Sequence, residues 1–452
     1  MDKNDIIKRL RETDHNRVKV VITDMDGVLR GKYMHKDKLL SALESGFGFC
    51  SVVFGWDMVD GDYEKDIKIT GWHTGYGDFD ADVALDSYRT IPWEGNVPFF
   101  LADFGGNAAD SLAVCPRSLL KTVIGKAQDM GYMPQYAQEF EWFNYRETSE
   151  SLQGKSHTDL APLTPGMFGY SILRMSENQG YFTDLFDMLE GFGVPLEGLH
   201  TETGPGATEA AIRYSDILEA ADRAVLFKTA VKEIGYRHGV RASFMAKPSQ
   251  ELPGCGGHIH QSLWDLQTGK NCFYDESREK NRSTIMEHFL AGQLHCLPEI
   301  LPMFAPTVNS YKRLVIGAWA PVNKTWGHDN RTCSLRVLTN GEKSTRIEHR
   351  VVGSDVNPYL AMTACLASGL YGIQQELPLK IPETTANGYA VKKGLLPSNL
   401  WEAAQKMKRS KIAHTLFGDT FVDHFTKTRQ WEWTQFMAAV TDWETKRYFE
   451  II

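Results

Sequence analysis

Two carboxylates lie two positions apart in the segment QEFEWF, which spans Gln138 to Phe143. Glu139 and Glu141 occupy positions i and i+2, and alternate residues of a β-strand point to the same face, so a strand here places both side chains together. Two like charges so close are costly unless a cation neutralises them or water solvates the whole face. The segment alone therefore leaves two interpretations open, a metal site and a solvated acidic strand face.

Three further segments supply groups that bind metal ions. In HTETGPGATE, Glu202 and Glu209 flank a Gly-Pro-Gly turn that can fold both carboxylates toward one point. In GCGGHIHQS, His258 and His260 share one face of an expected strand, and in RIEHR, Glu348 lies between arginines. Carboxylate ligands in this number, with few imidazoles, favour Mg²⁺ or Mn²⁺ over Zn²⁺.

The stretch VVITDMDGVLRGK, from Val20 to Lys32, raises a competing hypothesis. An apolar strand that runs into Asp24 and Asp26 is how a haloacid-dehalogenase-type phosphatase presents its aspartyl nucleophile. Such an enzyme also needs a second acidic motif after a long parallel-sheet domain. The acidic pairs that could form this motif lie too close to Asp26 for the parallel sheet to fit between them. Asp-Gly between two apolar runs favours a hairpin turn instead, in which both aspartates are structural.

The elements that must position these groups fall into two regions. In the first, a charged N-terminal helix precedes apolar stretches that predict strands at 18–26, 48–57 and 96–104. In the second, helical periodicity over 116–132 and 215–239 alternates with expected strands at 136–143, 242–248 and 256–263. We therefore expect an α+β protein with a small sheet domain over 1–110 and a larger α+β domain over 111–452.

Composition narrows the classes of function. Of the 452 residues, 42% are hydrophobic and 23% are charged, which are ordinary globular values, and the net charge of −8 leaves no basic surplus for a nucleic-acid partner. Seven scattered cysteines without a CxxC pair predict neither a disulfide framework nor a zinc finger, and fit a reducing cytoplasm. Because no run of about 18 apolar residues occurs, we expect no membrane partner.

Taken in order, the segments resemble the glutamine synthetase family over nearly the whole chain. The motifs that carry the resemblance are ExE, HxE with a Gly-Pro-Gly turn and a second Glu, GGHIHQS, NSYKRL, NRxxxLR, and RIExR followed by NPYLA. The pattern DxxGxxRGK from Asp24 is typical of the synthetase-like branch that acts on amines. The resemblance implies a β-grasp-like N-terminal domain, a glutamine-synthetase-type catalytic domain, and a dodecamer of two stacked hexamers with active sites between subunits.

The resemblance also implies roles for individual residues. One metal ion, near the amine and glutamate, would be held by Glu141, Glu202 and Glu209. A second, at the ATP phosphates, would be held by Glu139, His258 and Glu348. Residues placed around ATP are Glu197, Tyr214, His260, Ser262, Arg336, Lys343 and Arg346. Glutamate would be held by Gly254, Arg313 and Arg350, and Arg331 would face the γ-phosphate.

The implied reaction is phosphoryl transfer followed by acyl transfer. The side-chain carboxylate of L-glutamate attacks the γ-phosphate of ATP, with Mg²⁺ or Mn²⁺ and the arginines offsetting the gathered negative charge. A primary amine then displaces phosphate from γ-glutamyl phosphate. The products would be a γ-glutamylamide, ADP and phosphate.

The acceptor side departs from ammonia-using members of the family. Those usually carry Glu after NSYKRL, where this chain has Trp319. An indole there can wall a pocket for an organic amine, or it can simply pack beneath a loop. Asp57, next to Trp56, falls about where the family places an ammonium-binding aspartate from the neighbouring subunit. We therefore assign Trp319, Asp57 and Trp56 to the amine pocket.

The sequence thus predicts a cytoplasmic, ATP-dependent glutamate–amine ligase whose acceptor is an alkylamine or arylamine. One alternative is an ordinary ammonia-using glutamine synthetase. Another is a non-catalytic structural or regulatory relative, against which the full set of acidic ligands argues, because buried carboxylates are costly to keep.

Overall fold

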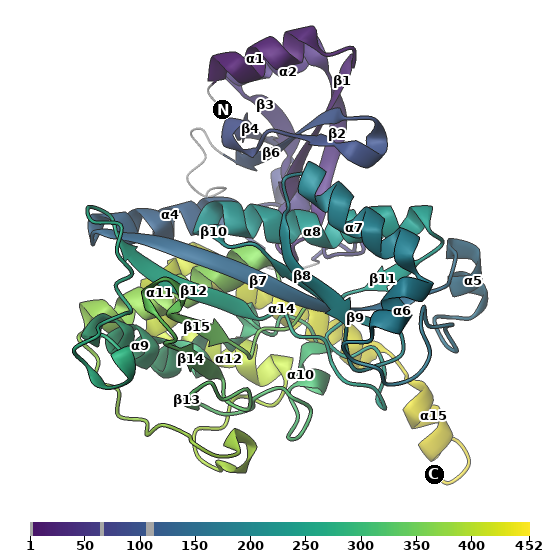
Figure 1. Ribbon diagram of the computed structural model, residues 1–452. Coiled ribbons are helices and arrows are strands. Elements are labelled where there is room, and N and C mark those ends of the chain that lie inside the picture. The colour runs from purple at the N-terminus through teal and green to yellow at the C-terminus, as the bar shows by residue number, and fades with distance from the viewer. Residues whose placement is uncertain (1–2, 64–66, 105–112) are drawn as a thin grey trace.

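The computed structural model describes residues 3–63, 67–104 and 113–452, which form two β-sheets with helices packed on them (Figure 1). The N-terminal sheet has the strand order β2-β1-β6-β4-β3, with β5 paired to β6. Its strands are β1 (Arg17–Thr23), β2 (Leu29–His35), β3 (Phe47–Cys50), β4 (Asp78–Val83), β5 (Arg89–Ile91) and β6 (Val97–Phe104). Helices α1 (Lys3–Glu12) and α2 (Lys36–Ser45) pack against it. The parallel pairing of β1 with β6 beside the β1–β2 hairpin fits the expected β-grasp-like domain.

The predicted strands at 18–26 and 96–104 are confirmed, whereas the prediction for 48–57 is largely wrong. Only the first residues of that stretch belong to β3, and Ser51–Phe54 form a 3-10 turn. Val53 and Phe54 are both buried in the core. Consecutive strand residues point to opposite faces, so the turn is what allows both side chains to face the same core.

The turn between β1 and β2 decides the role of the two aspartates. Asp24 accepts hydrogen bonds from the backbone N–H groups of Asp26 at 3.0 Å and Val28 at 2.9 Å, and from Arg30 Nε at 2.9 Å. Asp26 accepts one from Arg429 at 2.6 Å. Because both carboxylates are buried and hydrogen-bonded, the hairpin-turn prediction is confirmed and the phosphatase hypothesis is wrong.

The larger sheet has the strand order β13-β14-β15-β12-β7-β9-β8, and β10 and β11 also pair with β7. Its strands are β7 (Tyr132–Tyr145), β8 (Leu196–Thr201), β9 (Ala207–Ile212), β10 (Ser215–Asp216), β11 (Arg241–Ser243), β12 (Ile259–Asp265), β13 (Trp326–His328), β14 (Leu335–Leu338) and β15 (Arg346–His349). The long strand β7 runs through the middle of the domain in Figure 1.

Four long helices pack in the core of this domain: α4 (Pro116–Asp129), α8 (Ile217–Arg237), α9 (Thr284–Ile300) and α11 (Pro358–Gln374). Further helices of the described residues are α5 (Ser149–Gly154), α6 (Ile172–Glu177), α7 (Gln179–Gly191), α10 (Ser310–Arg313), α12 (Leu400–Arg409), α13 (Lys411–Phe417), α14 (Asp419–Ala438) and α15 (Asp442–Tyr448). Within the described part of the chain, no helix is both long enough and apolar enough to cross a bilayer.

The packing of α8 fixes which way β7 faces. Phe140 of β7 stacks on Phe227 of α8 and Trp142 meets the same ring edge-to-face, each with ring centroids 5.6 Å apart. Residues that alternate with them point away from α8, so Glu139 and Glu141 lie together on the opposite face, as the sequence predicts.

A buried ionic cluster joins the N-terminal sheet to helices α4, α8 and α11 of the larger domain. The Arg117 guanidinium donates to Asp103 of β6 at 2.8 Å and to both carboxylate oxygens of Asp222 of α8, and Tyr359 also donates to Asp222 at 2.6 Å. The domain boundary predicted between residues 110 and 111 falls within 105–112, outside the described residues, and stays a prediction.

Candidate active site

The β7–β9–β8 ladder gathers the acidic groups of the first two motifs. Glu141 lies directly opposite Glu209, and Glu209 lies opposite His200 on β8. The Gly-Pro-Gly turn then returns the chain so that Glu202 and Glu209 meet. Its last glycine, Gly206, has a φ of +75°, and a Cβ there would come within 2.3 Å of a backbone oxygen, so the turn requires glycine.

A first cluster of potential metal ligands forms where β7, β12 and β15 run side by side. Glu139, His260 and Glu348 offer ligand atoms that all lie within 4.8 Å of one another. His258 joins them, because its Nδ1 lies 2.6 Å from Glu139 Oε1 and 3.7 Å from Glu348 Oε1. The predicted triad of Glu139, His258 and Glu348 therefore comes together, with His260 beside it.

A second cluster forms around the Gly-Pro-Gly turn. His200, Glu202 and Glu209 offer ligand atoms within 4.8 Å of one another, and His200 Nε2 lies 3.3 Å from Glu209 Oε1. Glu141, the remaining member of the predicted triad, lies across the ladder, where its carboxylate accepts a hydrogen bond from the backbone N–H of Gly256 at 2.7 Å.

The two clusters differ in their electrostatics. Burial disfavours ionisation of Glu139, but hydrogen bonds from His258 and His260 outweigh it and hold the pKa of Glu139 well below its usual value. Burial opposes ionisation of Glu348 too, yet the positive charge of Arg350 lowers the pKa of Glu348 to about 2. The two carboxylates of the first cluster are thus ionised, and they lie among donors and cationic groups.

In the second cluster, burial outweighs the groups that favour ionisation of the carboxylates. Burial raises the pKa of Glu141 and of Glu209, and the charges of neighbouring carboxylates add to the effect. Carboxylates this close ionise easily only if a cation neutralises them. Three carboxylates and an imidazole form a ligand set that fits Mg²⁺ or Mn²⁺.

The arginines predicted at the substrates lie against the first cluster. Arg313 lies under His258, with an N–N distance of 3.4 Å, and Arg350 is paired with Glu348. Both are nearly buried, whereas the Arg331 side chain is exposed. Gly254 lies so close to Arg313 that a Cβ would meet its side chain at 2.7 Å, which explains glycine there.

A cavity of about 330 Å³ adjoins the first cluster and collects most of the predicted ATP-binding residues. Those that line it are Glu139, Glu197, Tyr214, His260, Ser262, Lys343 and Arg346. Arg336 lies outside the lining but donates to Glu348 at 2.9 Å. The cavity therefore combines cationic side chains with a group of potential metal ligands at one end. A nucleoside triphosphate with a bound metal ion fits this composition.

Sequence reasoning missed three residues of the site. His200 belongs to the second cluster, and its position two residues before Glu202 was a usable signal because alternate residues of an extended segment point the same way, although β8 ends at Thr201. Tyr170 stacks on His200 with ring centroids 4.2 Å apart, a contact between a loop and strand β8 that no sequence spacing reveals. Trp264 lines the nucleotide cavity and donates to Ser262 at 2.9 Å; the period of two along β12 could have found it.

Of the three residues assigned to the amine pocket, only Trp319 lies close in sequence to a residue that contacts one of the clusters, Arg313. It lies in the loop after α10, and α10 ends with Arg313. Trp319 is 64% exposed, so within this chain its indole does not pack beneath a loop, and its place in the amine pocket stays a prediction. Its φ of +56° is rare for a bulky side chain, which indicates that the loop is held in a demanding conformation.

Asp57 and Trp56 lie instead against the C-terminal helices and the N-terminal hairpin. Asp57 accepts from Trp431 of α14 at 3.0 Å and from the backbone N–H groups of Val59 and Gly61. The Arg30 guanidinium lies over the Trp56 ring at 5.6 Å. Among the described residues, the contacts of this pair are not with either metal cluster of the same chain, so a role at the acceptor requires a second subunit and stays a prediction.

Comparison with known proteins gives a consistent picture. Residues 113–448 match the family model described as glutamine synthetase, catalytic domain. The chain is 52% identical to type-1 glutamine synthetase 2 of Dictyostelium discoideum, over 99% of this chain and 86% of that protein. It is 35% identical to a glutamate–isopropylamine ligase of a Pseudomonas species, over 96% and 95% of the two chains.

Two further similarities concern amine ligases and solved structures. A γ-glutamylethanolamide synthetase of Streptomyces coelicolor is 35% identical over 97% of this chain and 93% of that protein. A solved structure of GmaS with ADP superimposes with a TM-score of 0.85 at 26% identity, covering 98% of this chain and 99% of that chain.

Proposed function

The chain belongs to the glutamine synthetase family of ATP-dependent C–N ligases, and on that premise we propose that it joins the side-chain carboxylate of L-glutamate to an organic primary amine, giving a γ-glutamylamide, ADP and phosphate. Enzymes of this family use ATP and divalent metal ions. The acceptor that we propose is an alkylamine or arylamine, with ammonia as a poor substitute.

The acceptor loop is the observation that carries the proposal. Residues 314–322, LVIGAWAPV, contain no ionisable side chain, and they follow Arg313, which contacts His258 of the first cluster. Ammonium and alkylammonium ions must lose a proton before they attack an acyl phosphate, and a carboxylate near the acceptor assists that step, whereas an arylamine is neutral at pH 7 and does not need it. This loop offers an exposed indole at Trp319 and exposed apolar side chains at Val315 and Ile316 instead. Such a surface favours an acceptor with an organic substituent.

The names of the relatives support a glutamate–amine ligase and also leave a glutamine synthetase as an alternative. Two relatives at 35% identity are named as ligases for isopropylamine and for ethanolamine products, whereas the relative at 52% identity is named a glutamine synthetase. An ammonia-using glutamine synthetase is therefore the second candidate, and the two differ in acceptor alone.

The chain's own groups have distinct tasks in this reaction. A divalent ion bound at each cluster supplies charge neutralisation for the phosphates and for the glutamate carboxylate. Lys343 and Arg346 would hold the triphosphate, and Arg331, whose side chain is exposed, would reach the transferred phosphate. Closure of the acceptor side by a neighbouring subunit would exclude water, which otherwise hydrolyses the acyl phosphate.

We further propose that a neighbouring subunit completes the acceptor side with its own Asp57 and Trp56, in a ring-stacked dodecamer. Support comes from exposed apolar side chains of the N-terminal region: Val59, two residues after Asp57, and Trp72 are each 79% exposed, which is unusual for large apolar side chains and fits a subunit contact.

Phosphate release tests the proposal. Purified protein with Mg²⁺, ATP and L-glutamate is assayed with ammonium, methylamine, isopropylamine, ethanolamine, putrescine and aniline at equal concentrations. We expect at least one substituted amine to be turned over at least tenfold faster than ammonium. The variant Trp319→Glu should raise the rate with ammonium and lower it with the preferred amine, while Trp319→Phe, the matched aromatic control, should keep the preference. Ammonium as the best acceptor of the wild type would establish the rival instead.

A further inference from the structure

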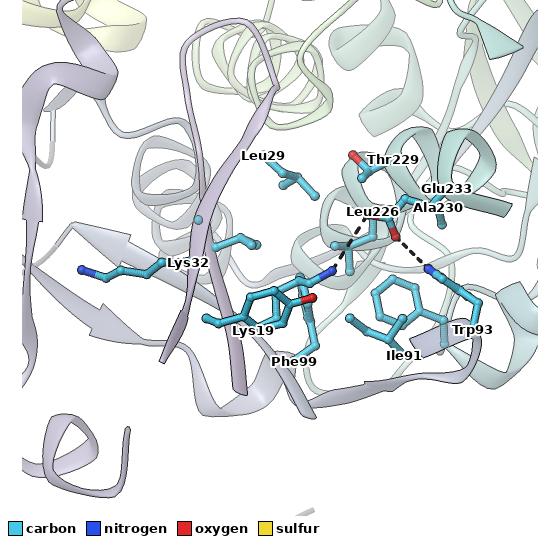
Figure 2. A pocket seen from close by; sticks show the side chains of 14 residues that line it. Lys19, Leu29, Lys32, Ile91, Trp93, Phe99, Leu226, Thr229, Ala230 and Glu233 are labelled. Carbon is cyan, nitrogen blue, oxygen red and sulfur yellow. Dashed lines mark hydrogen bonds and ion pairs between the residues drawn. The ribbon is translucent and has the colours of Figure 1, made fainter. Parts of the chain in front are cut away.

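A second cavity lies between the N-terminal sheet and helix α8, on the side of the molecule where the β1–β2 hairpin covers the helix (Figure 2). Its volume is about 240 Å³, roughly eight times the 30 Å³ that one water occupies in the liquid. The walls are mostly apolar and come from segments distant in sequence: Val21, Leu29 and Phe99 from the sheet, Leu226 and Ala230 from α8, and Phe192 after α7.

One end of this cavity is polar and carries an organised set of charges. Glu233 of α8 accepts a hydrogen bond from Trp93 Nε1 at 2.8 Å, and its other oxygen lies 4.0 Å from Lys19 Nζ. Lys19 is already paired with Glu94, which also accepts from the Tyr33 hydroxyl at 2.9 Å. Figure 2 shows the Lys19, Trp93 and Glu233 side chains converging at this end.

The charges at the polar end do not balance. Lys19 and Glu94 neutralise each other, and the carboxylates raise the pKa of Lys19 despite its partial burial, so it stays protonated. Lys32 lines the cavity only with its stem, because its ammonium points away in Figure 2 and bonds to the carbonyl of Gly48 at 3.3 Å. Glu233 shares the ammonium of Lys19 with the closer Glu94, so its negative charge is only partly compensated; its side chain is 37% exposed and has acceptor capacity beyond its hydrogen bond from Trp93.

We propose that this cavity is a binding site for a small organic monoammonium ion, whose ammonium group donates to Glu233 and whose hydrocarbon body lies among Val21, Phe99 and Leu226. An apolar cavity with a few convergent polar groups is the usual form of a small-molecule site. The unbalanced carboxylate selects a cation over a neutral or anionic ligand. A body of about eight non-hydrogen atoms fills the volume.

The site is separate from the candidate active site, since the two share no lining residue among those described. The ligand would bridge the N-terminal sheet and α8, and the opposite side of α8 packs on β7, the strand that carries Glu139 and Glu141. Because the ligand class overlaps the acceptor class of the proposed function, the test must separate the two sites.

Isothermal titration calorimetry without ATP or glutamate measures binding at this cavity apart from the ligase reaction. The probes are benzylammonium, benzyl alcohol and benzoate, which share one ring and differ in charge. We expect benzylammonium to bind at least tenfold more tightly than the other two. Glu233→Gln should weaken its binding at least fivefold, and Thr229→Phe, which fills the cavity from a half-buried position on α8, should abolish it. Glu190→Gln, at an exposed position of α7, is the matched control and should bind as the wild type does.

Three outcomes would overturn the proposal: no binding of benzylammonium, equal or tighter binding of benzoate, or unchanged binding in both cavity variants when their melting temperatures match the wild type. Trp319→Ala distinguishes the two amine sites, because binding here must survive it, and loss of binding in that variant would assign the amine to the acceptor pocket instead. Since no turnover is involved, binding at this cavity stands even if the ligase proposal fails.

Discussion

Replacement of Glu141 by Gln tests the assignment of the second cluster to a divalent ion. The change keeps the size of the side chain and removes one of three carboxylate charges. A divalent ion about 4 Å from a unit charge interacts with it by about 2 kcal/mol in water and by about 8 kcal/mol at an effective dielectric of 20. The smaller value alone corresponds to about a thirtyfold change in an equilibrium constant, since about 1.4 kcal/mol is tenfold. We therefore expect the Mg²⁺ concentration for half-maximal ADP formation to rise at least thirtyfold.

The same variant has an expected effect on stability that separates charge from folding damage. Burial raises the pKa of Glu141, which shows that its charge is unfavourable there without a cation. In metal-free buffer the melting temperature of Glu141→Gln should therefore equal or exceed that of the wild type, and added Mg²⁺ should raise the wild type more. The control is Glu190→Gln. An unchanged Mg²⁺ requirement in Glu141→Gln would refute the ligand assignment.

Other parts of the molecule give further expectations. Arg117→Met leaves Asp103 and Asp222 buried without their cation, so the free energy of unfolding in urea should fall by about 3 to 5 kcal/mol, and a loss below about 1 kcal/mol would contradict the buried-cluster interpretation. Burial lowers the pKa of Lys228 to about 7, so between about pH 7 and pH 10 the unfolded chain binds the extra proton and stability should rise with pH. Urea unfolding at pH 7 and pH 9 should show a gain of about 1 to 3 kcal/mol in the wild type that Lys228→Met lacks; an equal gain in both would assign it to other groups. Lys343→Ala should raise the KM for ATP roughly tenfold through loss of a charged hydrogen bond, with the KM for glutamate as the internal control.

The parts of the site that local pattern governs were predictable. Glu139 and Glu141 follow the period of two along β7, and the Gly-Pro-Gly turn brings Glu202 to Glu209 by backbone geometry alone. Both features depend on residues close in sequence, so the sequence was sufficient to predict them.

The parts set by long-range packing were not predictable. Tyr170 reaches His200 through a loop, and the stretch around Phe54 leaves its strand because two consecutive side chains enter one core. The cavity beside Glu233 exists only because the β1–β2 hairpin lies over α8, about two hundred residues later in the chain. No periodicity in the β1–β2 hairpin or in α8 indicates that the two lie in contact.

A one-pot competition with labelled substrate tests the central proposal most directly. The enzyme receives ATP, Mg²⁺, L-glutamate with ¹⁸O in its side-chain carboxylate, and equal concentrations of ammonium, isopropylamine, ethanolamine and aniline, and mass spectrometry identifies the amides and the phosphate. We expect a substituted γ-glutamylamide as the main product and one ¹⁸O atom in each phosphate, because the carboxylate oxygen attacks the γ-phosphate. Glutamine as the main product would contradict the acceptor assignment, and phosphate without ¹⁸O would contradict the γ-glutamyl phosphate route.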